Sequence, residues 1–344
     1  MGKIYLDRNE NNYGPAPACL DVVRNAEYDL FYRYSSDYKQ GMKSILSGRL
    51  SKEFNIPEKR VLLGYGAEDL LKQVVQCHLT EGKKLMIPSH SWWYYKEIAN
   101  EVNGINIEYP LIEGENNYTY DIEKMLDIYK TEKPDIVFIS SPNNPTGNSI
   151  SDDDLIKVLD NLSDSVVVLD EAYWFSNNNN QATDLVNKYK NLIIIRTFSK
   201  LYALAGIRIG YALVGENLIL LSKMSNRYLG YNRISQRIAI AALDSPDYYL
   251  DLASKMSADR EMYYNELNQL PGFKVYKSDA NFVLVKIPKE IMAPLDDFLK
   301  ERGFIIKFMK EELLNSHLRI SLGTHEQNRK AIDYIKEFMN KASN

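Results

Sequence analysis

The chain has 344 residues, of which 45% are hydrophobic and 26% are charged, and its formal net charge is −4. This balance is typical of a globular protein with a substantial core, and the length suffices for one large domain and a smaller one. A slightly acidic chain gives no electrostatic reason to expect nucleic acid or an anionic membrane as a partner. An anionic ligand would therefore have to be captured by a local site.

Cysteine and histidine usage argues against disulfide and metal chemistry. Cys19 and Cys77 are too few for a disulfide framework and fit a reducing compartment. The histidines lack the spacing of zinc motifs, so we expect no metal site. The polar amino terminus lacks the apolar core of a signal peptide, and the apolar runs are far shorter than the roughly 18 residues of a membrane span. We therefore expect a cytoplasmic protein. The scattered histidines are His78, His90, His317 and His325.

Short apolar runs alternate with amphipathic stretches between residues 62 and 214. Several runs are rich in Val and Ile without polar alternation, which is typical of strands buried on both faces. Amphipathic stretches predict helices over 68–78 and 151–162, and Ser151 and the acidic residues after it suit a helix start. This alternation predicts an α/β fold with a mostly parallel sheet covered by helices. The expected strands span 85–87, 105–111, 135–140, 165–169, 192–197 and 209–214.

The last hundred residues predict a compact α+β module. Helices are expected over 248–270, 291–302 and 326–339, and strands over 273–276, 282–285 and 318–321. We expect an N-terminal arm over residues 1–30, a large domain over 31–240 and a small domain over 241–344. The asparagine tract at 177–180 predicts a surface loop.

Lys200 lies just beyond the end of a predicted strand, in the segment Thr-Phe-Ser-Lys-Leu-Tyr-Ala-Leu-Ala-Gly-Ile-Arg-Ile-Gly at 197–210. α/β enzymes place their sites where strands end. A lysine there is either a solvated surface charge or a nucleophilic amine that its neighbours tune. Thr197, Ser199 and Arg208 surround it with two hydroxyls and a cation, which suit a phosphate ester. We therefore favour the functional interpretation.

Two further motifs follow the ends of predicted strands. Ser-Ser-Pro-Asn-Asn-Pro-Thr-Gly at 140–147 could by itself be a turn, because Asn, Pro and Gly are turn residues. Asp170 follows the run at 166–169 and is followed by Glu-Ala-Tyr. A carboxylate at the end of a buried strand is costly unless a cationic group pairs with it.

In order and spacing, these motifs resemble the cofactor site of fold-type I pyridoxal 5'-phosphate enzymes, specifically the class I and II aminotransferases. The resemblance runs from Asn-Glu-Asn-Asn-Tyr-Gly at 9–14, through Gly-Tyr-Gly-Ala-Glu at 64–68, to Leu-Arg-Ile-Ser-Leu-Gly-Thr at 318–324. The chain is most similar to histidinol-phosphate aminotransferases and their relatives, which include threonine-phosphate decarboxylase. The resemblance implies a large domain with a mostly parallel mixed sheet, a smaller α+β C-terminal domain, pyridoxal phosphate as cofactor and a homodimer.

The resemblance assigns roles around the cofactor ring. Lys200 matches the lysine that holds the cofactor and later moves a proton between it and the substrate Cα. Asp170 would pair with the pyridine nitrogen, and Tyr173 and Asn144 would hydrogen-bond the ring oxygen. Trp92 resembles the aromatic residue that stacks on the ring. A buried core aromatic is the plain alternative, and a shift of one residue would give the stacking role to Trp93.

Other matching residues are expected to bind the cofactor phosphate. Three of them begin a helix, where backbone N–H groups and the helix dipole suit an anion. Tyr34 matches a tyrosine that relatives extend across the dimer interface to the phosphate of the neighbouring subunit. The expected phosphate ligands within the chain are Gly66, Ala67, Glu68, Thr197, Ser199 and Arg208.

The substrate residues implied by the resemblance lie near the two ends of the chain. Arg319 matches the arginine that clamps a substrate carboxylate as a bidentate pair, with a structural salt bridge as the alternative. Lys307 stands where histidinol-phosphate aminotransferases usually have a phosphate-binding arginine, and a lysine does not reproduce the guanidinium fork. Asn11 and Tyr13, in the first motif, are further candidates for substrate contact. The departure at Lys307 leaves room for another small phosphorylated or phosphonate amine.

Three functions are consistent with these residues. The first is an aminotransferase that uses an amino acid such as glutamate together with a small phosphorylated or phosphonate partner. The second is a decarboxylase of a phosphorylated amino acid, which would share every cofactor residue. The third is a non-catalytic binding protein with the same fold. The presence of Lys200, Asp170 and Tyr173 together argues against the third.

Overall fold

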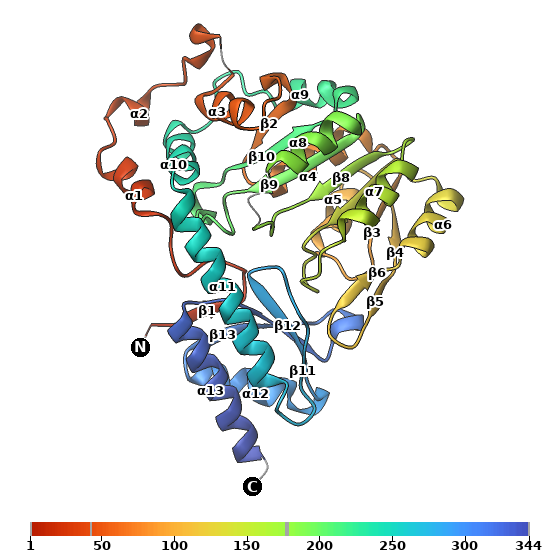
Figure 1. Ribbon diagram of the computed structural model, residues 1–344, viewed down its shortest axis with the longest axis vertical. Coiled ribbons are helices and arrows are strands. Elements are labelled where there is room, and N and C mark those ends of the chain that lie inside the picture. Colours follow the sequence, from red (N-terminus) through yellow and green to blue (C-terminus); the bar gives the residue numbers. More distant parts are fainter. Residues whose placement is uncertain (1, 42, 176–178, 343–344) are drawn as a thin grey trace.

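The computed structural model describes residues 2–41, 43–175 and 179–342. Within these residues, a seven-stranded sheet of order β2-β10-β9-β8-β7-β3-β4 dominates the larger part of the molecule (Figure 1). Neighbouring strands run parallel, except that β10 is antiparallel to both β2 and β9. The predicted α/β fold with a mostly parallel sheet is confirmed. The strands are β2 (Val61–Gly64), β3 (Lys84–Pro88), β4 (Ile105–Tyr109), β7 (Ile136–Ser140), β8 (Val166–Asp170), β9 (Leu192–Thr197) and β10 (Gly210–Val214).

The central strands are apolar on both faces because helices cover both sides of the sheet. Alternate residues of β8 enter two separate cores: Val167 and Leu169 pack into one, and Val168 packs into the other. Helices α3, α6, α7, α8 and α10 contribute to the first core, and α4, α5 and α9 to the second. Their bounds are α3 (Ile45–Glu53), α4 (Ala67–His78), α5 (Tyr94–Asn100), α6 (Ile122–Glu132), α7 (Asp152–Asn161), α8 (Asn179–Lys188), α9 (Ile219–Ser225) and α10 (Arg233–Leu243).

The expected helix start at Ser151 is present, since its hydroxyl accepts a hydrogen bond from the backbone N–H of Asp154 at 3.2 Å. The asparagine tract differs from the expected loop. Asn179 and Asn180 open helix α8, whereas Asn177 and Asn178 lie outside the described residues. Among the described residues, none of the helices combines the length and the apolar character that crossing a membrane requires.

A second, five-stranded sheet of order β1-β13-β14-β12-β11 forms the C-terminal module. In Figure 1 the long helix α11 leads from the large sheet into this module, and the N-terminal strand β1 lies beside β13. Residues 4–6 of the expected arm therefore belong to the C-terminal sheet, where Leu6 is fully buried. The bounds are β1 (Ile4–Leu6), β11 (Lys274–Val275), β12 (Phe282–Lys286), β13 (Phe304–Phe308), β14 (His317–Ser321), α1 (Pro17–Arg24), α2 (Asp29–Tyr32), α11 (Pro246–Leu267), α12 (Met292–Glu301) and α13 (His325–Ala342).

A hairpin of β5 (Leu111–Glu113) and β6 (Tyr118–Tyr120) ties the large sheet to the C-terminal module. The Glu113 carboxylate accepts hydrogen bonds from Tyr276 at 2.6 Å, Lys274 at 2.9 Å and Lys286 at 3.2 Å. Burial alone would raise the pKa of Glu113, but these donors outweigh it and lower the pKa to about 2. The Glu113 carboxylate therefore stays ionised at neutral pH.

His317 predicts how stability depends on pH. Burial, reinforced by the charge of Lys286, lowers its pKa from 6.5 to about 4. In the unfolded chain His317 binds a proton below about pH 6.5, whereas in the folded protein it does so only near pH 4. The free energy of unfolding should therefore decrease as the pH is lowered from about 6.5 to 4, by at most about 3 kcal/mol. The variant His317→Gln should flatten this dependence in denaturant unfolding at a series of pH values. An unchanged slope in His317→Gln would contradict the assignment.

Candidate active site

A cavity of about 770 Å³ lies where β7, β8 and β9 end, between the large sheet and the C-terminal module. Ser140, Asp170 and Thr197 reach it from the last positions of these three strands, because parallel strands end at one edge of a sheet. Lys307 and Arg319 reach it from β13 and β14, where they are paired across neighbouring strands. The cavity thus collects polar groups that are far apart in the chain.

Asp170 is 4% exposed at the end of β8. Its Oδ2 accepts a hydrogen bond from Tyr95 at 2.5 Å, and its Oδ1 accepts one from the backbone N–H of Ala172 at 3.0 Å. Burial raises the pKa of Asp170, and the Tyr95 hydrogen bond opposes that rise. Within the described residues no basic side chain forms an ion pair with it. The site therefore suits a ligand that brings its own cationic N–H group.

Tyr173 and Asn144 face the cavity and are held from the N-terminal and C-terminal segments. The buried Tyr173 hydroxyl accepts a hydrogen bond from Asn9 Nδ2 at 2.9 Å, and its ring packs edge-on against Phe282. Asn144 Oδ1 accepts a hydrogen bond from Arg319 Nη1 at 2.6 Å. Both expected partners of a ring oxygen are thus fixed by other residues of the cavity wall.

The amine of Lys200 projects into the same cavity. Its Nζ donates to the backbone carbonyl of Arg8 at 3.2 Å and lies 5.5 Å from the centre of the Tyr173 ring. The turn that carries Lys200 is anchored by Asn11, whose Nδ2 donates to the carbonyl of Leu201 at 2.9 Å. A primary amine is therefore presented beside the buried carboxylate.

The N-terminus of helix α4 meets Arg208 at one end of the cavity. Gly66 precedes the helix with a φ of +88°, and a Cβ there would lie 2.8 Å from Arg208 Nη2, so only glycine leaves room for the guanidinium. Among the described residues no side chain caps this helix, so its first N–H groups suit an anion. Ala67, Arg208 and the hydroxyl-bearing Ser199 all line the cavity. This arrangement fits a phosphate group.

Glu68 also lines this end, with its carboxylate 3.6 Å from Arg208 Nη2. On the strand side, Ser199 forms hydrogen bonds with the Thr197 hydroxyl through its own hydroxyl at 3.0 Å and its backbone N–H at 3.1 Å. The structure thus brings together all the residues of this chain that we expected around the phosphate.

Arg319 has an incomplete set of partners. Its Nη1 and Nη2 bond Asn144 and the carbonyl of Asp7, each at 2.6 Å, but its Nε is buried without a partner. No carboxylate side chain among the described residues pairs with the guanidinium, so the alternative of a structural salt bridge does not hold. Burial lowers its pKa. A guanidinium that faces a cavity without a carboxylate partner suits a carboxylate ligand.

Trp92 and Trp93 both line the cavity but differ in exposure. Trp92 is partly buried against the core and packs edge-on against Tyr95 with ring centroids 5.9 Å apart. Trp93 is 57% exposed. The more fixed ring is that of Trp92, which is the better placed of the two to stack on a ligand inside the cavity.

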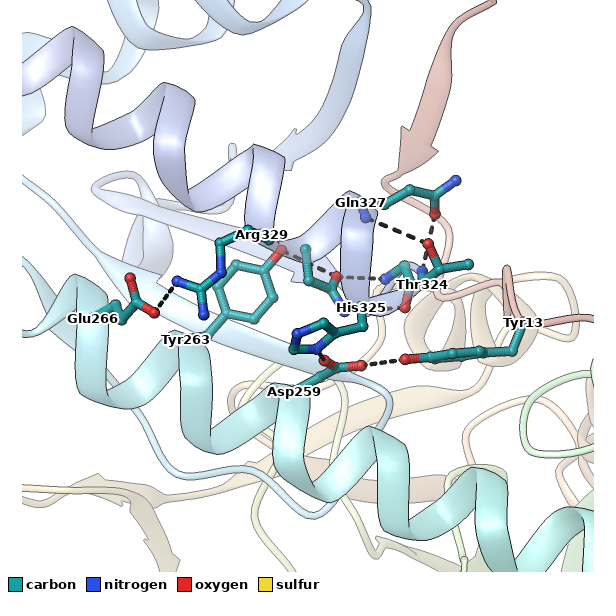
Figure 2. Close-up of polar contacts among 10 residues, drawn as sticks. Tyr13, Asp259, Tyr263, Glu266, Thr324, His325, Gln327 and Arg329 are labelled. Carbon is teal, nitrogen blue, oxygen red and sulfur yellow. Dashed lines mark hydrogen bonds and ion pairs between the residues drawn. The ribbon is translucent and has the colours of Figure 1, made fainter.

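Four expected site residues lie outside the cavity wall: Gly66, which precedes α4 beside Arg208, and Asn11, Tyr13 and Tyr34. Asn11 uses its side chain to hold the loop after Lys200. Figure 2 shows the hydroxyl of Tyr13 directed at Asp259, to which it donates at 2.7 Å, while His325 approaches the same carboxylate from the other side. Tyr34 is 71% exposed. Within one chain, Asn11 and Tyr13 therefore fix the N-terminal segment instead of lining the substrate cavity.

The sequence interpretation missed groups that complete the wall. Asn9 holds Tyr173, and the carbonyls of Asp7 and Arg8 accept hydrogen bonds from Arg319 and Lys200. Asn9 belongs to the motif at 9–14, which could have identified it as a site residue. Tyr95 lies three residues beyond Trp92 and carries no signature of its own.

A phosphorylated pyridine aldehyde suits these groups. Its ring nitrogen can carry the proton that faces Asp170, its phosphate suits the start of α4 and Arg208, and its aldehyde suits the amine of Lys200. The site and the sheet order together define a fold-type I pyridoxal-phosphate enzyme.

The comparison with protein families agrees. Residues 3–335 match the aminotransferase class I and II family, and the chain belongs to that family. It is therefore a pyridoxal 5'-phosphate-dependent aminotransferase, as the sequence predicted.

Individual relatives give a consistent picture. The chain is 31% identical over 337 residues to histidinol-phosphate aminotransferase of Ruminiclostridium cellulolyticum, covering 97% of this chain and 92% of that protein. It is 31% identical over 342 residues to the enzyme of Methanosphaera stadtmanae, covering 98% and 90%. The expected similarity to histidinol-phosphate aminotransferases is confirmed.

Solved structures share the fold. The crystal structure of histidinol-phosphate aminotransferase from Sinorhizobium meliloti in complex with pyridoxal-5'-phosphate has a TM-score of 0.87 at 23% identity and covers 99% of this chain and 92% of that chain. L-threonine-O-3-phosphate decarboxylase from Porphyromonas gingivalis has a TM-score of 0.81 at 19% identity, with 98% and 99% covered. One fold thus serves both reactions in these proteins, so the fold does not choose between them.

Lys200 gives a direct test of the cavity assignment. Borohydride reduction of the purified enzyme should fix a pyridoxyl group on Lys200, because its amine lies in the cavity beside Asp170. Peptide mapping by mass spectrometry locates the group. Lys200→Ala should lose both this attachment and the visible absorption of the bound cofactor. Lys223→Ala, on α9 away from the cavity wall, should retain both. A pyridoxyl group found on another lysine would show that the site is misplaced.

Proposed function

We propose that this aminotransferase moves an amino group between an amino acid such as glutamate and a small phosphorylated or phosphonate partner. The observation that carries the proposal is the guanidinium of Arg319, which forms no ion pair with a carboxylate side chain of the described residues and lies beside Lys307 on the cavity wall. One cation suits a carboxylate, and two neighbouring cations suit a doubly charged phosphate. The named activity of the relatives, histidinol-phosphate aminotransferase, makes histidinol phosphate one member of this class.

When bound, pyridoxal phosphate supplies a carbonyl carbon that takes up the amino group and a ring that delocalises negative charge from the substrate Cα. Asp170 would hold a proton on the ring nitrogen, which increases that delocalisation. Tyr173 and Asn144 would hydrogen-bond the ring oxygen, and Trp92 would pack against the ring. The start of α4, with Arg208, Thr197 and Ser199, would hold the phosphate.

Lys200 moves the proton. Its amine lines the cavity beside the Tyr173 ring, and it would hold the cofactor and serve as the base for the proton at the substrate Cα. Arg319 fixes the substrate carboxylate, which orients the Cα–H bond toward that amine. Transamination needs this proton to leave Cα, whereas decarboxylation needs the carboxylate bond at Cα to break.

We also propose a homodimer, in which Tyr34 reaches the phosphate site of the neighbouring subunit. The segment around α2 carries a cluster of exposed aromatic side chains, which is unusual for a surface left in water. Tyr28 and Tyr32 contact each other with ring centroids 5.3 Å apart. The exposed fractions are 81% for Tyr28, 64% for Phe31, 59% for Tyr32 and 71% for Tyr34. A cytoplasmic location fits the two cysteines, which are typical of a reducing compartment.

The two halves of the reaction separate the roles of Arg319 and Lys307. Adding glutamate to the enzyme should convert the bound cofactor to its pyridoxamine form, and the loss of visible absorption measures this conversion. Arg319→Lys should slow this half-reaction by about a hundredfold, because a buried bidentate pair is lost. Lys307→Ala should act mainly on the phosphorylated partner, with KM raised by about tenfold or more.

Lys310→Ala is the matched control, since Lys310 is exposed on the same segment but does not line the cavity. It should leave both half-reactions at wild-type rates. Release of CO₂ from a phosphorylated amino acid, with no change in absorption on adding glutamate, would instead identify a decarboxylase and refute the proposed transamination.

The dimer is tested by sedimentation velocity. The enzyme should sediment as a dimer, and Phe31→Asp combined with Tyr34→Asp should shift it toward monomer and weaken cofactor binding. Ile156→Asp, which also places a carboxylate at an exposed apolar position but on α7, should leave the dimer intact. A wild-type monomer with full activity would contradict the shared site.

A further inference from the structure

Tyr95 is a buried residue in direct contact with the carboxylate at the base of the cavity. It lies on α5, is 1% exposed, and donates its hydroxyl proton to Asp170 Oδ2 at 2.5 Å. A hydrogen bond of this length to an ionised acceptor belongs to the stronger class of protein hydrogen bonds.

Aromatic packing fixes the direction of this hydroxyl. The Tyr95 ring lies edge-on to Phe138 with centroids 5.1 Å apart, and edge-on to Trp92 with centroids 5.9 Å apart. Phe138 belongs to β7, the strand beside β8, so the sheet that positions Asp170 also positions its partner. Tyr95 therefore connects the buried acid to the aromatic residue expected to cover the cofactor ring.

Other buried tyrosines near these strands use their hydroxyls differently. Tyr109 donates to the carbonyl of Phe138 at 2.9 Å, and Tyr120 donates to the carbonyl of Ser140. Those bonds satisfy backbone groups of the sheet. The hydroxyl of Tyr95 instead meets a titratable side chain that lines the cavity.

The carboxylate retains capacity for a third donor. Each of its oxygens can accept two hydrogen bonds. Oδ1 holds the N–H of Ala172 and Oδ2 holds the hydroxyl of Tyr95, which leaves room for a ring N–H from the cavity. The two protein donors set the orientation of the carboxylate before the third arrives.

We propose that Tyr95 is a positioning residue that keeps Asp170 ionised and aimed at the cofactor's ring nitrogen. This inference rests on the proposed pairing of Asp170 with that nitrogen. Without the hydroxyl, the carboxylate would be more basic and would draw the proton of the ring nitrogen toward itself. The ring then loses positive charge, and it binds more weakly.

The surrounding charges are consistent with this role. Burial raises the pKa of Asp170, Glu171 adds to the rise, and Tyr95 and Lys200 oppose it. Burial also raises the pKa of Tyr95 well above its ordinary range, so its hydroxyl remains a donor at neutral pH. Tyr95 is thus a donor that does not titrate with the acid it supports.

The test compares Tyr95→Phe with Tyr109→Phe as holoenzymes. Both changes remove one hydroxyl from a fully buried tyrosine, but only the first removes a donor from Asp170. Tyr95→Phe should raise the apparent pKa of the cofactor's visible absorption band by about one pH unit and raise the cofactor dissociation constant by about tenfold. Tyr109→Phe should lower thermal stability to a similar degree and leave both readings near wild type.

Asp170→Asn separates this inference from the pairing on which it rests. If Asp170→Asn shifts the titration while Tyr95→Phe behaves like Tyr109→Phe, the positioning role of Tyr95 is refuted and the pairing stands. If Asp170→Asn also leaves the titration unchanged, both fail. We expect the titration of the visible band to shift in Tyr95→Phe and in Asp170→Asn, and to stay unchanged in Tyr109→Phe.

Discussion

The structure depends on one electrostatic constraint, the burial of the Asp170 carboxylate where a central strand ends. A carboxylate that is 4% exposed is costly unless hydrogen bonds and an opposite charge compensate it. The protein provides two neutral donors, Tyr95 and the N–H of Ala172, and no ion pair among the described residues. The missing positive charge is what a protonated pyridine ring supplies. Because the carboxylate is buried, an opposite charge beside it interacts more strongly than it would in water.

The N-terminal segment and the C-terminal sheet close the other side of the cavity. Asn9 contacts both Tyr173 and Ser321, which lie in different parts of the chain. Arg319 joins Asn144 of the large part to the carbonyl of Asp7. Arg319 and Asn144, which we propose as ligands of the substrate and of the cofactor ring oxygen, thus belong to one hydrogen-bond network.

The sequence was most informative where function follows local chain order. Asp170 and Lys200 were predicted as site residues because each follows an apolar run. In parallel sheets, ligands bind at the edge where the strands end. The pattern also predicted a helix over 68–78, and the family resemblance pointed to its start at 66–68 as a phosphate site. These features need no knowledge of distant contacts.

Features that depend on distant contacts were not predictable in this way. Asn9 and Ser321 are 312 positions apart, and no local pattern shows that β1 joins β13 in the C-terminal sheet. The motif at 9–14 was expected to contact substrate through Asn11 and Tyr13, and only the fold shows that Asn9 faces Tyr173 while Tyr13 turns to Asp259. Tyr95 was missed because a hydroxyl on a buried tyrosine has no sequence signature, and its partner comes from another element.

The central claim, that the buried Asp170 carboxylate holds a proton on the cofactor ring, is tested most directly by nitrogen NMR. Enzyme reconstituted with pyridoxal phosphate labelled with ¹⁵N in the ring reports the protonation of that nitrogen through its chemical shift. The account predicts a protonated ring nitrogen at neutral pH in the wild type and an unprotonated one in Asp170→Asn. An unprotonated nitrogen in the wild type, or a shift that Asp170→Asn leaves unchanged, would contradict it.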